Sequence, residues 1–321
     1  MDPRLDACVP ACGERRCGPD PVCGQVCGIC PKEEVCSTSG TCHAPATWQD
    51  VPHPPINTIQ DVWASGPSDV WMVGDAPVAS GGLRGIVLHY DGKKISELPI
   101  PPSPTLNGVG GSSSNDVWVV GDKGEILRYM IGSWKRRPSP TIEILFDVWV
   151  DSPKAAWAVG REGAFRYDPI KGWTKATPVG WNLTKVCGRA SDDIWATGPG
   201  IEVHFDGKTW EKQYLPKTWP YDVALWCEPG SDVWIAMTSK VYRYHGHRWT
   251  NVKFPPQKDI YMWDLHGTSS TDLWAAASDT LHYDGKTWTV SSLKGPFAIF
   301  AVAPDDVWAA GIDYIAHYHY R

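Results

Sequence analysis

Three tryptophans do not occupy the positions at which the other tryptophans recur along the chain. Trp181, Trp219 and Trp263 lie in or just after segments that join one predicted repeat unit to the next, and Tyr221 and Tyr261 accompany them. Exposed aromatic rings combine a large apolar face with a polar edge, which suits stacking on sugars and is equally favoured at protein interfaces. We therefore predict a ligand-binding surface at these five residues.

Charged side chains fall in the same part of each unit. Asp222, Asp264 and His266 lie close to these aromatic residues, and we predict that they belong to the ligand site. Carboxylates around a channel can bind Ca²⁺, act as an acid–base pair, or accept hydrogen bonds from backbone amides. The amide interpretation is favoured, because no calcium-loop or zinc-ligand spacing is present, so neither a cofactor, a metal site nor a catalytic residue is predicted. The position of Asp264, ten residues before a repeating Trp, is also occupied by Asp61, Asp147 and Lys185.

Ten cysteines indicate disulfide chemistry. Eight of them fall within a short N-terminal stretch that has almost no apolar residues, which is typical of a disulfide framework. A zinc site is the weaker alternative, because only Cys27 and Cys30 have the short ligand spacing. Cys187 and Cys227 precede the Trp of adjacent units, and we expect them to pair as well. The N-terminal set, whose connectivity the sequence leaves open, is Cys8, Cys12, Cys17, Cys23, Cys27, Cys30, Cys36 and Cys42.

A motif of Asp, an aliphatic residue and Trp positions all of these groups. It recurs at intervals of 34 to 47 residues, the length of a four-stranded propeller blade. An apolar residue stands nine positions before each Trp, and a His or Arg followed by an aromatic residue comes after it. An Asp-Gly-Lys type of turn, which favours a hairpin, then leads to a further Trp. The anchor tryptophans are Trp71, Trp118, Trp157, Trp195, Trp234, Trp274 and Trp308.

Seven units predict an all-β, seven-bladed β-propeller. The seventh unit ends at Arg321 before a fourth strand, and Thr47–Val51 has the missing pattern. We therefore expect this N-terminal strand to complete the last blade, because an open ring would leave unpaired strand edges. The expected domains are a Cys-rich module at 1–45 and the propeller at 46–321. Trp63, Trp149 and Trp226, which share one register in the first strand, are interpreted as framework.

The repeats resemble the Trp-rich tectonin and tachylectin propeller lectins, and also the Asp-Val-Trp repeat propellers of secreted bacterial proteins. The turns from His204 to Trp210 and from His282 to Trp288 look like a shortened Asp-box of the sialidase type. The resemblance covers about residues 46–321 and implies the architecture more than the activity, since propellers have many unrelated functions.

The composition limits the classes of partner that this protein is expected to bind. A net charge of −6 argues against nucleic acid, and no apolar run is long enough to cross a membrane as a helix. The cysteines predict an oxidising compartment: secreted, cell-surface or periplasmic. We predict a monomeric binding protein whose leading ligand is a glycan. The alternatives are a scaffold that docks a surface protein, and a propeller glycosidase or polysaccharide lyase.

Overall fold

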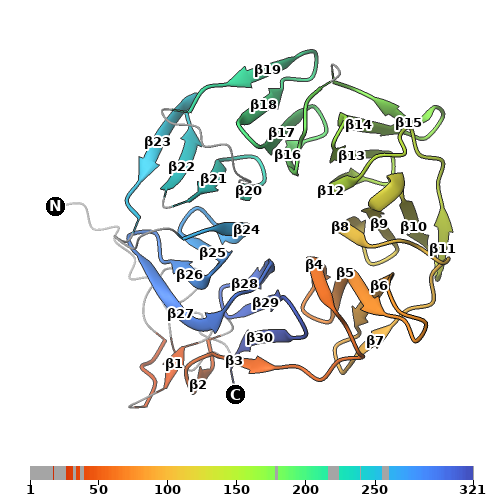
Figure 1. Cartoon of the computed structure of the whole chain (residues 1–321). Coiled ribbons are helices and arrows are strands. Elements are labelled where there is room, and N and C mark those ends of the chain that lie inside the picture. The colour runs from red at the N-terminus through yellow and green to blue at the C-terminus, as the bar shows by residue number, and fades with distance from the viewer. Residues whose placement is uncertain are drawn as a thin grey trace, which may run out of the picture.

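The chain forms a closed ring of seven β-sheets, which confirms the predicted all-β propeller (Figure 1). The computed structural model describes residues 17, 27–31, 34–36, 40–177, 180–215, 224–238, 240–254 and 260–320. Each blade is an antiparallel sheet whose strands a to d run from the centre of the ring outward. Among the described residues, the helical content is one 3₁₀ turn, η1 (Asp122–Gly124).

The strands follow the predicted repeat. Blades 1 to 3 consist of β4 (Thr58–Gly66), β5 (Asp69–Pro77), β6 (Leu83–Tyr90), β7 (Ile95–Glu97); β8 (Leu106–Ser113), β9 (Asp116–Gly121), β10 (Ile126–Met130), β11 (Ser133–Arg136); and β12 (Leu145–Ser152), β13 (Ala155–Gly160), β14 (Gly163–Asp168), β15 (Gly172–Lys175). Blades 4 to 6 consist of β16 (Lys185–Ala190), β17 (Asp193–Gly198), β18 (Ile201–Phe205), β19 (Trp210–Gln213); β20 (Ala224–Cys227), β21 (Val233–Met237), β22 (Lys240–His245), β23 (Arg248–Val252); and β24 (Met262–Ser269), β25 (Asp272–Ala277), β26 (Asp279–Tyr283), β27 (Trp288–Lys294). Blade 7 consists of β28 (Ala298–Ala303), β29 (Asp306–Ala310), β30 (Ile315–His319) and β3 (Thr47–Asp50).

The repeating tryptophans hold neighbouring blades together. Every anchor Trp is at most 2% exposed. In blade 1, Trp71 on strand b packs against Tyr129 on strand c of blade 2, and edge-on against Trp134 on strand d of blade 2. The same arrangement recurs at later boundaries, with Trp118 on Tyr167 and Trp173, for example. The three repeated aromatic positions therefore form one cluster between blades, which is why they keep a common phase.

The N-terminal strand closes the ring, as predicted. In Figure 1, β3 lies beside β30, although the two come from opposite ends of the chain. Trp48 pairs with Tyr318 across these strands and packs edge-on against Trp274 of blade 6. Its Nε1–H also donates to the Ser291 hydroxyl over 2.7 Å. Trp48 thus takes the strand-d role that a Trp takes in five of the other blades.

The His or Arg of strand c pairs with the Asp of the motif, which confirms their predicted framework role. The Nε2 of His89, for example, lies 2.7 Å from Asp69, and the Nε of Arg128 lies 2.7 Å from Asp116. Blade 3 has Ala155 in place of the Asp, and there Arg166 is exposed. The remaining Asp pairs are His204 with Asp193, Arg243 with Asp232, His282 with Asp272 and His317 with Asp306.

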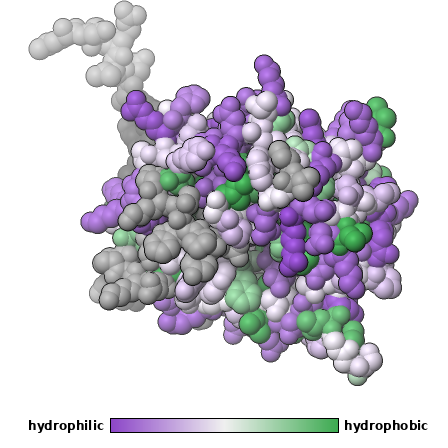
Figure 2. All heavy atoms as spheres, turned by 45° about the horizontal axis from the view of Figure 1, so that its top comes forward, coloured by the Kyte–Doolittle hydropathy of each residue, from purple (hydrophilic) through white to green (hydrophobic). Residues whose placement is uncertain are grey.

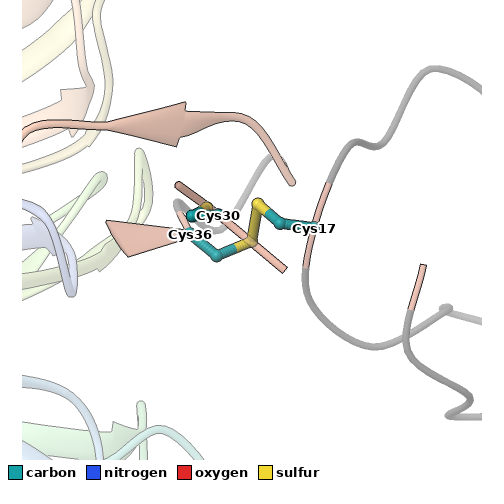
Figure 3. A group of neighbouring side chains, drawn as sticks. All are labelled: Cys17, Cys30 and Cys36. Atoms are coloured by element: carbon teal, nitrogen blue, oxygen red, sulfur yellow. A yellow bond between two sulfur atoms is a disulfide. The ribbon is translucent and has the colours of Figure 1, made fainter. Parts of the chain in front are cut away.

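The N-terminal cysteines form disulfides where the structure describes them. Cys17 is bonded to Cys36 and Cys30 to Cys42, and Cys27 is disulfide-bonded too. Figure 3 shows Cys17, Cys30 and Cys36 close together. Their sulfurs are within 4.8 Å of one another but belong to disulfides, so they are not thiolates that can bind zinc. The predicted cysteines Cys8, Cys12 and Cys23 lie outside the described residues.

Candidate functional site

The predicted aromatic surface is only partly described. Trp219, Tyr221 and Asp222 lie outside the described residues. Trp181 is half-buried and packs against the core of blades 3 and 4, while Trp263 packs edge-on against Phe297 at a centroid distance of 5.2 Å. Of the described aromatic residues in this prediction, Tyr261 alone is exposed, at 51%. Trp181 and Trp263 thus have packing partners at two separate blade boundaries.

Four charged side chains lie around the central channel at the position ten residues before the anchors. We call this set the charged ring: Asp61, Asp147, Lys185 and Asp264. Asp61 accepts the backbone N–H of Val62 and that of Val109 in the next blade, at 2.9 and 2.8 Å. Asp147 makes the same pair of bonds with Val148 and Val186, the second again in the next blade. Each carboxylate therefore joins strand a of one blade to strand a of the following one, which confirms the amide interpretation.

Asp264 joins this ring from blade 6 and is paired with Lys185. Its Oδ2 accepts the N–H of Ile299 in blade 7, and its Oδ1 lies 3.0 Å from the Lys185 ammonium. Burial raises the pKa values of Asp61 and Asp147; attraction to Lys185 opposes this rise, and repulsion from neighbouring carboxylates adds to it. Burial alone would lower the pKa of Lys185, but the three carboxylates raise it above its usual value.

A cavity of about 620 Å³ occupies the channel on one side of this ring. It extends along the strands a to the turns between strands a and b, where Gly66, Asp151, Arg189 and Thr268 line it. Asp264 and His266 also line it, but Trp181, Tyr261 and Trp263 do not. The cavity and the predicted aromatic surface are therefore on opposite sides of the charged ring, and the ligand face expected from the sequence does not hold this cavity.

Aromatic rings form the cavity wall eight residues before the anchors. An added Cβ on Gly188 would stand 2.5, 2.6 and 2.7 Å from three atoms of the six-membered ring of Trp149. These nearly equal distances show that the ring lies flat over this glycine, so its other face is turned away from blade 4. Trp63 lies against Gly111 of blade 2 in a similar way. Both rings are partly exposed and line the cavity.

His266 is a neutral part of the same wall. Its ring stacks on Phe300 of blade 7 at a centroid distance of 3.9 Å, and its Nδ1 accepts the Ala301 N–H over 3.2 Å. Burial lowers its pKa to about 4, so the imidazole is uncharged at pH 7 with its proton on Nε2. His266 therefore adds aromatic surface and a polar N–H to the cavity, without a charge.

A disulfide completes the wall between blades 4 and 5. Cys187 and Cys227 are bonded, as predicted, and both line the cavity. Blade 4 carries Lys185 at the ring position, and an ammonium has no acceptor for a backbone N–H. The disulfide thus links strands a at a boundary where the ring supplies no carboxylate.

Sequence reasoning placed Trp63 and Trp149 in the framework and did not assign them to a site. The signal that could have found them is the register they share with Trp226, His266 and Phe300. Five blades have an aromatic or imidazole ring at this one position, and all five rings line the cavity.

Glu202 on β18 has a buried carboxyl group away from the channel. It is 3% exposed, its Oε1 has no partner among the described residues, and burial raises its pKa from 4.5 to about 7. Its contribution to stability is therefore fully present below pH 4.5 and is lost as the pH rises through 7. We expect Glu202→Gln to raise the free energy of unfolding by about 2 to 3 kcal/mol at pH 8.

Urea unfolding at pH 4 and at pH 8 checks this expectation. At pH 4 the wild-type carboxyl is protonated in both the folded and the unfolded chain, so the variant should gain little there. An equal gain at both pH values would mean that the charge of Glu202 is not the cause.

Comparisons with known proteins support the fold. A virginiamycin B lyase from Staphylococcus aureus, in a catalytically inactive His-to-Ala form with quinupristin, has a TM-score of 0.71 and 15% identity over 86% of this chain and 100% of that one. YCF48 bound to a D1 peptide has a TM-score of 0.67 and 17% identity, covering 87% of this chain and 96% of the other. The RRP9 WD40 repeats reach 0.68 with 8% identity, covering 86% and 98%. These likenesses show the propeller alone.

Two other comparisons give no match. No protein-family model matches the chain, and no curated protein matches it. The tectonin, tachylectin and Asp-box resemblances therefore stay predictions from the sequence. No helix among the described residues is long and apolar enough to cross a membrane.

Proposed function

We propose that this protein is a binding protein of an oxidising compartment, secreted or at the cell surface, and that a segment of a partner protein enters the central cavity. The observation that carries this proposal is the cavity of about 620 Å³, which lies within the size range of ligand pockets. Its aromatic wall and charged floor resemble the apolar lining with a few placed polar groups that such pockets have. Structural neighbours of this fold include a protein with a bound peptide.

The bonding of the polar groups favours binding over catalysis. Both carboxylate oxygens of Asp61 and of Asp147 already accept a backbone N–H, and Nδ1 of His266 does too. A general acid or base needs an atom within reach of the substrate proton, and these atoms are occupied by the fold. The proposal requires no cofactor.

A glycan is the second candidate ligand. The flat, partly exposed ring of Trp149 is suited to stacking on the apolar face of a sugar. This would keep the function predicted from the sequence while moving its site from the connecting segments to the channel.

Closing the mouth of the cavity tests the site. Gly66 lines the mouth, has no positive φ, and has no atom within 4 Å of an added Cβ, so it tolerates a side chain there. Peptides are first selected from a random library for binding to the wild-type protein. We expect Gly66→Trp to weaken their binding by more than tenfold in Kd. Ile170→Trp, at a site 93% exposed in the turn between strands c and d of blade 3, is the matched control and should bind normally.

The same three proteins on a glycan array separate the two ligand classes. Glycans that bind the wild type and the control but not Gly66→Trp would make the ligand a sugar. Ligands of either class that still bind Gly66→Trp with wild-type affinity would show that the cavity is not the site.

A further inference from the structure

The charged ring contains more negative than positive charge. Three carboxylates share a single ammonium, and that ammonium is hydrogen-bonded to Asp264. Among the described residues, neither Asp61 nor Asp147 has a side-chain cation within salt-bridge distance; both are held by backbone N–H groups. Buried carboxylates that repel one another are stabilised by an added positive charge, and a neutral ligand does not supply it.

The charged residues at the cavity mouth do not correct this imbalance. Arg189 is bonded to the Asp193 carboxylate at 2.6 Å and to the Ser231 carbonyl at 2.7 Å. Asp151, which also lines the cavity, adds a further negative charge. The neutral His266 contributes none. Acidic side chains therefore outnumber basic ones in the lining of the cavity.

The spacing of the carboxylates argues against a metal ion as the missing cation. Among the described residues, the group of potential metal ligands with donor atoms within 4.8 Å of one another is the cysteine set of the N-terminal module. Asp61, Asp147 and Asp264 do not come that close together, so they cannot jointly chelate one ion. An extended organic cation can approach them without such convergence.

The cavity wall suits a cation of this kind. The faces of indole rings attract Lys and Arg side chains, and the attraction is largest when the charge is desolvated. Trp63 and Trp149 come from blades 1 and 3, the blades that also supply Asp61 and Asp147. Each of these two carboxylates, which have no salt-bridge partner of their own among the described residues, therefore has a cavity-lining indole two residues further along the same strand.

We propose that the cavity recognises a basic side chain, lysine or arginine, of the partner protein. The aliphatic stem packs between the indole rings of Trp63 and Trp149, and the cationic end is directed toward Asp61 and Asp147. This inference rests on the proposed function and specifies its ligand.

The test compares small probes that differ in charge. The full chain, labelled with 5-fluorotryptophan, is titrated with Nα-acetyl-lysine amide and Nα-acetyl-arginine amide and followed by ¹⁹F NMR, with Trp63→Phe and Trp149→Phe assigning two signals. We expect both probes to shift these two signals saturably. Nα,Nε-diacetyl-lysine amide, which has the same stem without the charge, should bind at least tenfold more weakly.

Variants of the ring give a second measurement. Asp147→Asn keeps one acceptor oxygen and removes the charge, so it should weaken the binding of the cationic probes about tenfold. Asp61→Asn is the alternative if the first variant does not fold. Ile131→Ser, at a surface site 85% exposed, should leave binding unchanged. Equal binding of the charged and the acetylated probe would overturn the inference, whether or not the variants fold.

The library peptides separate this inference from the proposed function. Replacing each Lys by Nε-acetyl-lysine and each Arg by citrulline should abolish their binding. Some peptides could still bind the wild type after that change and yet fail to bind Gly66→Trp. This result would overturn the inference of a basic side chain and leave the cavity as the binding site. Peptides that are indifferent to Gly66→Trp would overturn both.

Discussion

Replacing Asp116 by alanine is expected to lower the free energy of unfolding by about 3 to 5 kcal/mol. The side chains of Asp116 and Arg128 are each 5% exposed, and the Nε of Arg128 lies 2.7 Å from the carboxylate. The guanidinium also donates to the Pro153 carbonyl of blade 3 over 2.8 Å and lies over the Trp118 ring. Without Asp116, a permanently charged group stays buried with neutral partners only. Equilibrium urea unfolding monitored by circular dichroism measures the loss.

The equivalent change in blade 7 is the control. Asp306 pairs with His317, which is partly buried and whose imidazole, unlike a guanidinium, is not permanently charged. Asp306→Ala should therefore cost only about 1 kcal/mol, the typical value of a hydrogen bond. The double variant Asp116→Ala with Arg128→Leu removes the stranded charge and should recover part of the loss. Equal losses for Asp116→Ala and Asp306→Ala would show that the Arg128 charge is not the cause.

The ring could be predicted from the sequence because the same contact recurs at each blade boundary. Trp71, Tyr129 and Trp134 meet between blades 1 and 2, and three residues in the same phase meet at later boundaries. Strand closure by Trp48 followed from the same reasoning, since the seventh unit lacks one member of this cluster. A repeat whose positions are fixed by packing against the next unit shows both its period and its number of blades.

The cavity could not be predicted, because its place depends on which strand-a side chains fill the channel. Asp61, Asp147, Lys185 and Asp264 cross the channel at one level, and the open volume is on the side of the turns between strands a and b. The sequence shows that these residues share a position, but not on which side of them space remains. The expected face followed instead from the aromatic residues of the connecting segments, and of the described ones Trp181 and Trp263 pack at blade boundaries while Tyr261 is exposed.

The roles of Trp63 and Trp149 show a further limit of phase arguments. The repeat period predicts that a residue in phase with it belongs to the framework, and these two rings do pack on glycines of the next blade. One face of a flat ring is enough for that contact, so the same residue can also line a cavity with its other face. A residue that keeps the repeat period is therefore in contact with a neighbouring blade, but this contact does not exclude a second role for the same residue in a binding site.

The double variant Cys187→Ser with Cys227→Ser is expected to lose about 4 kcal/mol of unfolding free energy, the value that the chain-entropy model gives for a loop of about 40 residues. The bond joins residues 40 positions apart in blades 4 and 5. At three other boundaries the ring links adjacent strands a by carboxylate–amide hydrogen bonds: Asp61 with Val109, Asp147 with Val186 and Asp264 with Ile299. Lys185 occupies that position in blade 4, so no carboxylate of the ring is present there to take over.

Two measurements on this variant separate a local effect from a global one. Under reducing conditions the variant and the wild type should unfold alike in urea, because both then lack every disulfide, including those of the N-terminal module. Hydrogen exchange should rise first at the β20 amides, whose strand is only Ala224–Cys227 and which lose their covalent link to β16. A loss below 1 kcal/mol would mean that Trp226, packed over Gly267 of blade 6, already holds β20 in place without the disulfide. In that case the wall of the cavity between blades 4 and 5 would be fixed by side-chain packing, and not by the cysteines.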